Sequence, residues 1–392
     1  MEKEIKILAI VLLVSTGFVG CKQSVSQNDD FITVDVTTGY PEKELILQDF
    51  MDVEYVALET TDDFLTQGSI LDIGEEIILV RNNINDGDIF VYDRSGKAIR
   101  KINRLGQGNE EYVSYSFGKV MLDEENSEIF IDDRRRIAVY DLFGNFLRSL
   151  PRSQSTNYSK LLNYDREHLI CREISIQIDE KSTESQPFAI ISKKDGSMVH
   201  DIRIRFEQGI NTIVMQTGSE SMMAVDLFAN TNTIIPFRDS WVLLEFSSDT
   251  IFRLLPDFSI TAFMARTPSV HSRTPEILFL PILLTDRYIF SETFKKEIER
   301  VPGFFRKTKL AYDRQEKKTY IYSIINDDYS IQKTLDFSAF YSNKTIAFWQ
   351  KIEAHELIEA NEKGELKGKL KELTEELEDD PNPVIMLVKN RK

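Results

Sequence analysis

The amino-acid sequence predicts an all-β fold, namely a six-bladed β-propeller. Three observations support this prediction: short apolar runs bounded by turn residues, a hairpin motif that recurs along the chain, and the absence of a Rossmann or P-loop glycine pattern. With 392 residues, the chain is long enough for two ordinary domains or for one large repetitive domain. The recurring motif favours a single propeller domain over residues 31–392.

The recurring motif is a β-hairpin. It reads I-x-V-Y-D-x-x-G-x-x-[IL]-R-x-[IL] at 89–102 and again at 137–150, which is 48 residues later, and a fainter copy lies at 189–202. Alternating apolar residues predict its two strands, and the Asp and Gly predict the turn between them. Another strand pair precedes each hairpin, as at 70–80. Four strands in this length are typical of one propeller blade.

The predicted blades follow one another along the chain. This count gives six blades and leaves seven open, because the later blades are less regular. The approximate ranges are 68–103, 117–150, 159–204, 232–265 and 276–325, and the last blade begins near Phe337.

The two ends of the domain are expected to close the ring. The C-terminal part offers two strands, at 344–349 and 383–388, so the last blade lacks a strand. The N-terminal apolar run at 53–58 has no blade of its own. We therefore expect this run to complete the last blade, which removes the open sheet edges at the closure.

A helical insertion is predicted between the two C-terminal strands, at about 353–378. Its leucines have helical spacing and form one apolar stripe. Packing of this stripe on the propeller edge is the favoured interpretation, and a partner-binding helix is the alternative. The stripe consists of Leu366, Leu370, Leu373 and Leu377.

The first residues of the chain predict export. Lys3 and Lys6 precede an apolar run at 7–14, which is too short to span a bilayer of about 30 Å and is typical of a signal peptide. Gly20 stands directly before Cys21, as in the lipobox of bacterial lipoproteins.

We therefore predict a signal peptide at 1–20, acylation of Cys21, and a flexible tether at 21–30 that follows the lipidated residue. An ordinary cleaved signal, or an uncleaved anchor with an incidental cysteine, is the alternative. The other cysteine, Cys171, lies in an apolar run and is interpreted as a small buried residue outside any disulfide.

Composition narrows the classes of partner. The formal net charge is −16 and the isoelectric point is near 4.9. Such an acidic chain repels phosphate backbones, so we expect no nucleic-acid binding.

Several segments, in their order and spacing, resemble the six-bladed β-propeller lipoproteins of Bacteroides and its relatives, which are similar to NHL-repeat propellers. The resemblance covers nearly all of the mature chain and implies the propeller fold and a location in the cell envelope, but no defined biochemical role. In the loop at 106–112, Asn109 and Glu110 stand where that family has Pro-Gly. The segments are 31–35, 53–60, the two Y-D-x-x-G hairpins, 106–112 and 382–386.

The histidines do not form a recognisable site. They lack the H-x-x-x-H and H-E-x-x-H spacings of metal centres, and the chain has no G-x-S-x-G elbow of a serine hydrolase. Surface or turn roles are therefore favoured over catalysis, although a composite site from distant blades stays open. The histidines are His168, His200, His271 and His355.

Paired aspartates occur at 132–133, 327–328 and 379–380. They could supply some of the six to eight oxygens of a Ca²⁺ site, but none has the spacing of a calcium loop. Capping of turn amides is the favoured role. The arginines at 134–136 are interpreted as turn residues with local ion pairs rather than a phosphate site.

The remaining candidate site residues are glycines and aromatic residues. Gly106-Gln107-Gly108 lacks the P-loop lysine, so a connection between blades is favoured over a phosphate cradle. Tyr112 and Tyr115 lie in the loop after the first blade. Trp241 and Trp349 lie in predicted strands and are assigned to the core.

Two functions follow from these observations. The favoured function is a cell-envelope lipoprotein whose propeller is a non-catalytic binding or assembly module for an envelope protein or a carbohydrate, bound at the channel mouth or on one ring face. The alternative is a propeller enzyme, a hydrolase or lyase for a carbohydrate or lactone, assisted by carboxylates and by Ca²⁺. We assign no catalytic residue, metal ligand or cofactor. The expected location is the outer membrane, held by the lipid on Cys21, with the periplasmic and surface faces both open.

Overall fold

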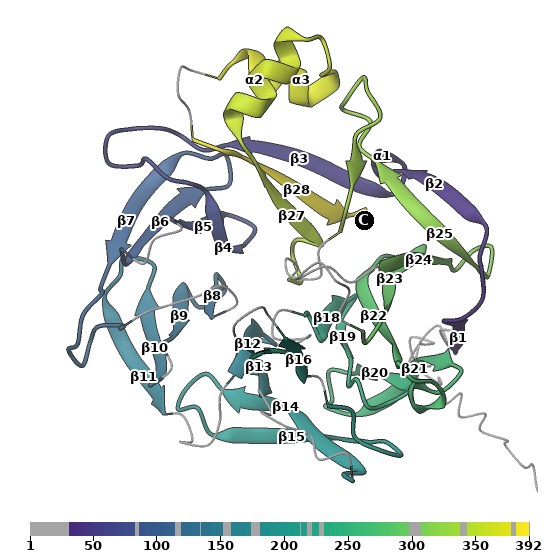
Figure 1. Cartoon of the computed structure of the whole chain (residues 1–392). Helices are drawn as coiled ribbons and strands as arrows, with labels where there is room; N and C mark the ends of the chain where they lie inside the picture. The colour runs from purple at the N-terminus through teal and green to yellow at the C-terminus, as the bar shows by residue number, and fades with distance from the viewer. Residues whose placement is uncertain are drawn as a thin grey trace, which may run out of the picture. The chain divides into compact units, whose positions relative to one another are not determined.

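Six sheets radiate around a ring in the unit that spans residues 31–392, so the predicted six-bladed β-propeller is confirmed (Figure 1). In the first five blades, the first strand lies nearest the ring axis and the later strands follow outward. None of the helices formed by the described residues is both long and apolar enough to cross a membrane. The computed structural model describes residues 31–82, 86–113, 119–133, 135–151, 158–173, 181–211, 213–217, 222–226, 231–297, 307–337, 343–377 and 382–391.

The first two blades contain the repeated hairpin as their third and fourth strands. Asp93 caps its turn by accepting two backbone N–H groups at 2.8 and 3.0 Å, and Asp141 accepts two at 2.8 Å. Gly96 and Gly144 have φ angles of +89° and +82°, which glycine adopts without strain. The strands are β4 (Ser69–Ile73), β5 (Ile77–Arg81), β6 (Asp88–Asp93), β7 (Ala98–Asn103), β8 (Val120–Asp123), β9 (Glu128–Asp132), β10 (Arg136–Asp141) and β11 (Phe146–Pro151).

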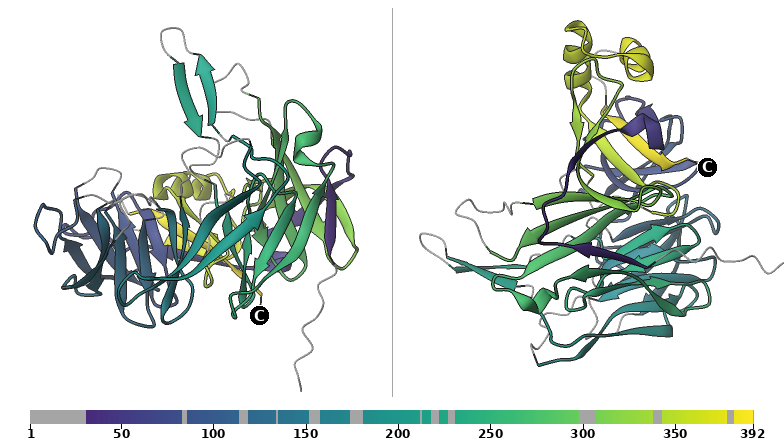
Figure 2. Two further views of the ribbon diagram at one scale, coloured as in Figure 1. Left: turned by 90° about the horizontal axis from the view of Figure 1, so that it is seen from below. Right: turned by 90° about the vertical axis from the view of Figure 1, so that its right-hand side faces the viewer.

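The third and fourth blades repeat this four-stranded order. Between them lies a separate two-stranded sheet, which stands away from the ring in Figure 2 (left). A short 3-10 helix, η1 (Val270–Ser272), follows the fourth blade. The strands are β12 (Tyr158–Asn163), β13 (His168–Glu173), β14 (Glu184–Ser192), β15 (Met198–Arg205), the separate pair β16 (Ile213–Thr217) and β17 (Met222–Asp226), then β18 (Ile234–Phe237), β19 (Ser240–Leu243), β20 (Thr250–Leu254) and β21 (Ile260–Thr267).

The fifth blade has an extra short strand, and the sixth blade closes the ring. The first described strand of the sixth blade begins at Phe348, because residues 343–346 form a turn in which Asn343 N–H donates to Ile346 O at 2.9 Å. The strand predicted at 344–349 is therefore placed too early, and residues 338–342, just after Phe337, lie outside the described part. The strands are β22 (Ile277–Leu284), β23 (Tyr288–Lys295), β24 (Lys307–Asp313), β25 (Lys318–Ile325), β26 (Thr334–Leu335), β27 (Phe348–Ile352) and β28 (Val384–Asn390).

The N-terminal segment forms an outer belt across the last three blades. The belt consists of β1 (Ile32–Asp35), β2 (Glu42–Ile46), α1 (Leu47–Phe50) and β3 (Met51–Ala57). Strand β1 pairs in parallel with β21, β2 pairs in parallel with β25, and β3 pairs antiparallel with β28. The prediction that the N-terminal strand completes the last blade is confirmed. The pairing of β1 and β2 with two further blades is an addition that the sequence did not indicate.

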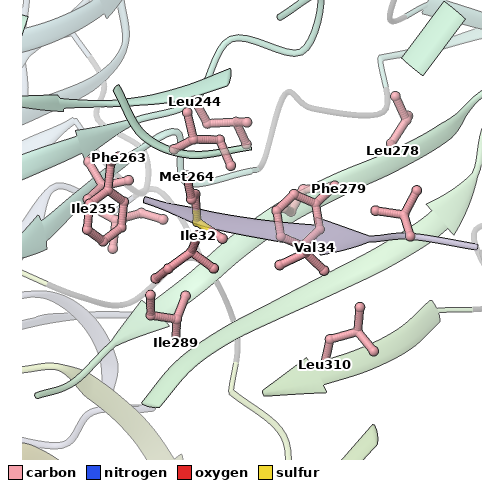
Figure 3. Close-up of a cluster of buried hydrophobic side chains, with 14 of the residues drawn as sticks. Ile32, Val34, Ile235, Leu244, Phe263, Met264, Leu278, Phe279, Ile289 and Leu310 are labelled. Atoms are coloured by element: carbon pink, nitrogen blue, oxygen red, sulfur yellow. The ribbon is translucent and has the colours of Figure 1, made fainter. Parts of the chain in front are cut away.

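The belt is held by apolar packing. Ile32 and Val34 of β1 are 5% and 2% exposed, and they lie in a cluster between the fourth and fifth blades with Phe279 and Leu310 (Figure 3). Burying a side chain of this size contributes about 1.5–3 kcal/mol. Strand β1 of the belt is therefore an integral part of the packing between the fourth and fifth blades.

The predicted helical insertion is confirmed, and it consists of two helices, α2 (Ala354–Glu362) and α3 (Gly368–Glu375). Gly364 has a φ of +71°, and Leu366 leaves the helix to pair with Tyr329 in an isolated β-bridge. The predicted stripe still packs on the propeller edge, because Leu366 and Leu370 are buried against Val384 of the sixth blade.

Candidate functional site

A cavity of about 530 Å³ opens at the centre of the ring. Its walls come from the inner strands of the first three blades, from Trp241 of the fourth, and from the turn at 343–345 of the sixth. Because residues from five blades meet there, the cavity lies at one mouth of the central channel. We call it the channel-mouth cavity.

Asp72, near the end of β4, is fixed in the wall of this cavity. Its Oδ2 accepts the backbone N–H of Leu122 at 2.8 Å, and its Oδ1 accepts the side-chain amide of Asn343 at 2.9 Å. Burial raises the pKa of Asp72 to about 6, an effect that these hydrogen bonds and the charge of Lys160 oppose. Burial likewise lowers the pKa of Lys160 to about 8. The carboxyl group of Asp72 therefore ties the first, second and sixth blades together.

Glu124 closes the turn of the first blade. Its carboxylate accepts the backbone N–H groups of Glu75, Glu76 and Ile77 at 2.7, 3.0 and 2.7 Å. A Cβ on Gly74 would lie 2.1 Å from this carboxylate, so any other residue at that position would have to displace the Glu124 side chain. Because Glu75 and Glu76 are exposed while they line the cavity, the rim is acidic.

A buried ion pair supports the wall between the second and third blades. Lys193 Nζ lies 2.6 Å from Asp123 Oδ2 and 2.7 Å from Asn163 Oδ1, and the side chains of Lys193 and Asp123 are 4% and 0% exposed. A buried charge that loses its partner is strongly destabilising. This network holds the cavity wall and leaves only the amide of Asn163 at the cavity itself.

Lys344 reaches across the mouth from the sixth blade to the third and fourth. Its Nζ donates to the carbonyl oxygen of Tyr164 and lies 5.4 Å and 5.0 Å from the ring centroids of Tyr164 and Trp241. The two rings stack with centroids 6.4 Å apart. Cation–π contacts of this kind contribute about 0.5–2 kcal/mol each. Desolvation of the ammonium lowers the pKa of Lys344, and the charge of Asp165 opposes this shift.

The assignment of the tryptophans to the core is confirmed, since Trp241 and Trp349 are 2% and 5% exposed. Trp241 nevertheless also lines the channel-mouth cavity. Its indole N–H has no hydrogen-bond partner among the described residues.

The structure brings two of the four histidines together. His168 and His200 both pack on Phe258, with ring centroids 5.7 and 5.6 Å away, and His168 Nδ1 lies 2.9 Å from Asp165. His271 and His355 lie apart from them, on η1 and α2. Among the described residues, no group of three or more His, Cys, Asp or Glu side chains could hold a metal ion.

Capping of turn amides, the role predicted for the paired aspartates, is confirmed for the pair at 132–133, whereas the carboxylate of Asp328 binds side chains of the outer belt instead. Asp133 accepts the backbone N–H groups of Arg135 and Arg136 at 3.0 and 3.1 Å and forms an ion pair with Arg135. Asp328 accepts hydrogen bonds from Gln48 and Tyr55 of the outer belt at 2.8 and 2.9 Å. The pair at 379–380, and Arg134, lie outside the described residues.

The remaining candidates are structural where they are described. Within Gly106-Gln107-Gly108, the N–H of Gly108 donates to Glu111 at 2.7 Å, so the loop is closed by its own carboxylate. Tyr112 is buried and donates its hydroxyl to Gly87 O at 2.5 Å. Cys171 is buried in a cluster between the second and third blades, as expected. Tyr115 and Cys21 lie outside the described residues.

Sequence reasoning missed Asp72, Glu124, Asn343 and Lys344. The first strands of several blades share one sequence feature near the cavity. A polar residue directly follows the apolar run of the strand, as in Leu71-Asp72, Leu122-Asp123 and Leu162-Asn163. Aligning the blades at this position would have collected Asp72 and Asn163, which line the cavity, and Asp123 of the supporting ion pair.

Comparison with one solved structure, which has a TM-score of 0.55, supports the fold. A Bacteroides fragilis protein described as exported covers 92% of this chain and 100% of its own, at 15% identity and a TM-score of 0.55. A DUF4221 protein from Bacteroides vulgatus covers 88% of this chain and 100% of its own, at 10% identity and a TM-score of 0.45. No curated protein matches the chain. A family model described as a domain of unknown function, DUF4934, matches residues 31–389, and the chain therefore belongs to this family.

Proposed function

We propose that this protein is a lipid-anchored binding module of the cell envelope, which holds a small ligand or a short segment of a partner in the channel-mouth cavity. The observation that carries the proposal is the cavity itself, where side chains from five blades converge. Its volume of about 530 Å³ lies within the range of small-molecule sites.

Binding is favoured over catalysis because the polar groups of the cavity are already engaged. Asp72 and Glu124 accept hydrogen bonds from the protein backbone, and Lys344 donates to a carbonyl. Nucleophilic catalysis that depends on Ser, Cys or His has no candidate here, because none of these residues stands among the described lining residues. The raised pKa of Asp72 is the observation that favours the enzymatic alternative, since such groups occur at active sites.

Export and anchoring are proposed from the N-terminal sequence. The apolar run at 7–14, Gly20 and Cys21 support a signal peptide with acylation of the cysteine. The similar Bacteroides fragilis protein is described as exported, which supports the same location. Growth with a radiolabelled fatty acid should label the full chain and should not label Cys21→Ser. Equal labelling of the wild type and of Cys21→Ser would contradict the attachment of a lipid to Cys21.

Ligand binding is tested with a variant that fills the cavity. Thr345 lines the cavity, so Thr345→Trp should block it, whereas Thr261→Trp places the same side chain at an exposed position of β21. Each full-length protein is purified from the envelope in mild detergent and analysed by mass spectrometry. We expect molecules retained by the wild type and Thr261→Trp to be absent from Thr345→Trp. Identical material on all three proteins would contradict a cavity ligand.

A further inference from the structure

The ammonium group of Lys344 occupies a ready-made subsite in the cavity wall. It lies over the stacked rings of Trp241 and Tyr164 and donates to the carbonyl oxygen of Tyr164. We propose that the ligand of the channel-mouth cavity carries a primary ammonium group, and that Lys344 occupies the place of that group while the cavity is empty of ligand. This inference rests on the proposed binding function and names the class of ligand.

The lysine is not needed to build the turn from which it extends. Asn343 holds this turn, because its Oδ1 accepts the backbone N–H groups of Thr345 and Ile346 at 2.9 and 2.8 Å. The amide group of Asn343 also donates to Asp72 at 2.9 Å and to Ile73 O at 2.7 Å. The side chain of Lys344 can therefore leave the rings while the turn keeps its shape.

The contacts of Lys344 suit exchange with another cation. The ion pairs formed by the described residues do not include Lys344, and its ammonium donates to the neutral carbonyl of Tyr164. Two aromatic faces and one carbonyl oxygen recognise a primary ammonium through the ring quadrupole and one hydrogen bond. A ligand ammonium can make the same contacts, so exchange keeps all of them.

The charge around the cavity favours a cationic ligand. Glu75, Glu76 and Glu125 line the cavity as exposed carboxylates, and the chain carries a formal net charge of −16. Carboxylates at the mouth of a cleft raise the local concentration of cations and repel anions. An alkyl amine therefore fits this site, and a phosphate-bearing ligand does not.

The test removes the internal ammonium and supplies it from solution. In the purified full chain, Lys344→Ala should bind n-butylammonium, whose four carbons and nitrogen match the whole lysine side chain from Cβ to Nζ, one methylene more than the substitution removes. At ten times its Kd the amine should raise the melting temperature of Lys344→Ala by about 1–3 °C. Equal concentrations of 1-butanol or NaCl should not raise this melting temperature. The melting temperature of the wild type should rise less in n-butylammonium than that of Lys344→Ala. Lys344→Gln is measured in the same way if the alanine variant does not fold.

The acidic rim is tested in the Lys344→Ala background. Adding Glu75→Gln and Glu76→Gln should weaken n-butylammonium binding about two- to fivefold, the range expected for exposed charges. Glu372→Gln, on the exposed surface of α3, is the matched control and should leave the Kd unchanged.

Failure of n-butylammonium to stabilise Lys344→Ala beyond 1-butanol and NaCl would overturn the ammonium subsite. An equal response of the wild type would also overturn it, because the amine would then bind elsewhere. Neither result bears on the retention of ligand that Thr345→Trp tests, so the cavity proposal and the ammonium proposal can fail separately.

Discussion

The first three blades and the last three differ at their outer edges. Strands β7, β11 and β15 end their sheets, whereas β1 and β2 are added to the fourth and fifth blades and β3 completes the sixth. At equivalent positions of the three bare edges, Ile99, Leu147 and Val199 are 41%, 46% and 41% exposed. One half of the ring is therefore specified by local hairpins, and the other half depends on a segment far away in the sequence.

The largest expected effect comes from removing the outer belt. Deletion of residues 31–57 takes a strand from three sheets and exposes the apolar cluster of Figure 3. We expect thermal unfolding, monitored by circular dichroism, to lose its cooperativity. We also expect rapid proteolysis of the last three blades. Deletion of residues 22–30 is the control and should leave the melting curve unchanged. A cooperative transition without the belt would show that the last three blades stand alone.

A matched pair of isoleucines sharpens the comparison. Ile32 of the belt is 5% exposed, and Ile99 on a bare edge is 41% exposed. Ile32→Ala should lower the free energy of unfolding by about 2–5 kcal/mol through lost burial and a residual cavity. Ile99→Ala should change it by at most about 0.5 kcal/mol. If chemical denaturation gave equal losses of unfolding free energy for the two variants, the belt would stabilise the fold no more than an ordinary edge strand does.

Replacing a turn glycine by alanine should destabilise the protein to a degree set by the atoms that the added Cβ would meet. At Gly96 a Cβ would lie 1.9 Å from the backbone oxygen of Ala57 in the belt, and at Gly144 it would lie 2.8 Å from the side chain of Ile102. Both positions have positive φ, which alone costs about 1–2 kcal/mol for alanine. Gly96→Ala should therefore destabilise more than Gly144→Ala, by about 1–2 kcal/mol in urea unfolding. The reverse order would contradict the close contact at the closure.

The last expected effect is a pH dependence of stability. The raised pKa of Asp72, about 6 against an ordinary 3.8, means that the folded state binds this proton more tightly than the unfolded chain. Stability of the wild type relative to Asp72→Asn should therefore rise as the pH falls from about 6 to about 4, by about 1–3 kcal/mol.

Asp93 supplies the control with the opposite sign. A hydrogen bond from Ser95 lowers the pKa of Asp93, so the stability that its ionised form contributes is lost as the pH falls through that lowered pKa. Denaturant melts at several pH values measure both variants. A slope of the same sign for Asp72→Asn and Asp93→Asn would contradict the burial of Asp72.

Local signals explain why the blades could be predicted from the sequence. Asp93 and Gly96 act within one turn, so the repeated motif reports them directly. The parallel pairing of Ile32 with Met264 leaves no such trace, because a short apolar strand does not indicate which distant edge it will join.

The site was harder to predict for the same reason. Lys344 meets Tyr164 across the ring, and Asp72 meets Asn343 through the closure, at separations of 180 and 271 residues. Each residue alone looks like an ordinary turn residue. The break in the helical insertion was missed because the leucine spacing continues through Gly364 even though the backbone does not.

The parallel pairing of β1 with β21 also sets an order of events during synthesis. Ile32 leaves the ribosome more than two hundred residues before Met264, its partner, exists. The belt strands therefore remain without their native neighbours until the later blades are made. Long-range strand pairs of this kind form slowly, and unpaired strand edges favour aggregation until they form. A chain built in this way gains from being kept unfolded until its last residue has been added, and the export proposed above would provide that delay.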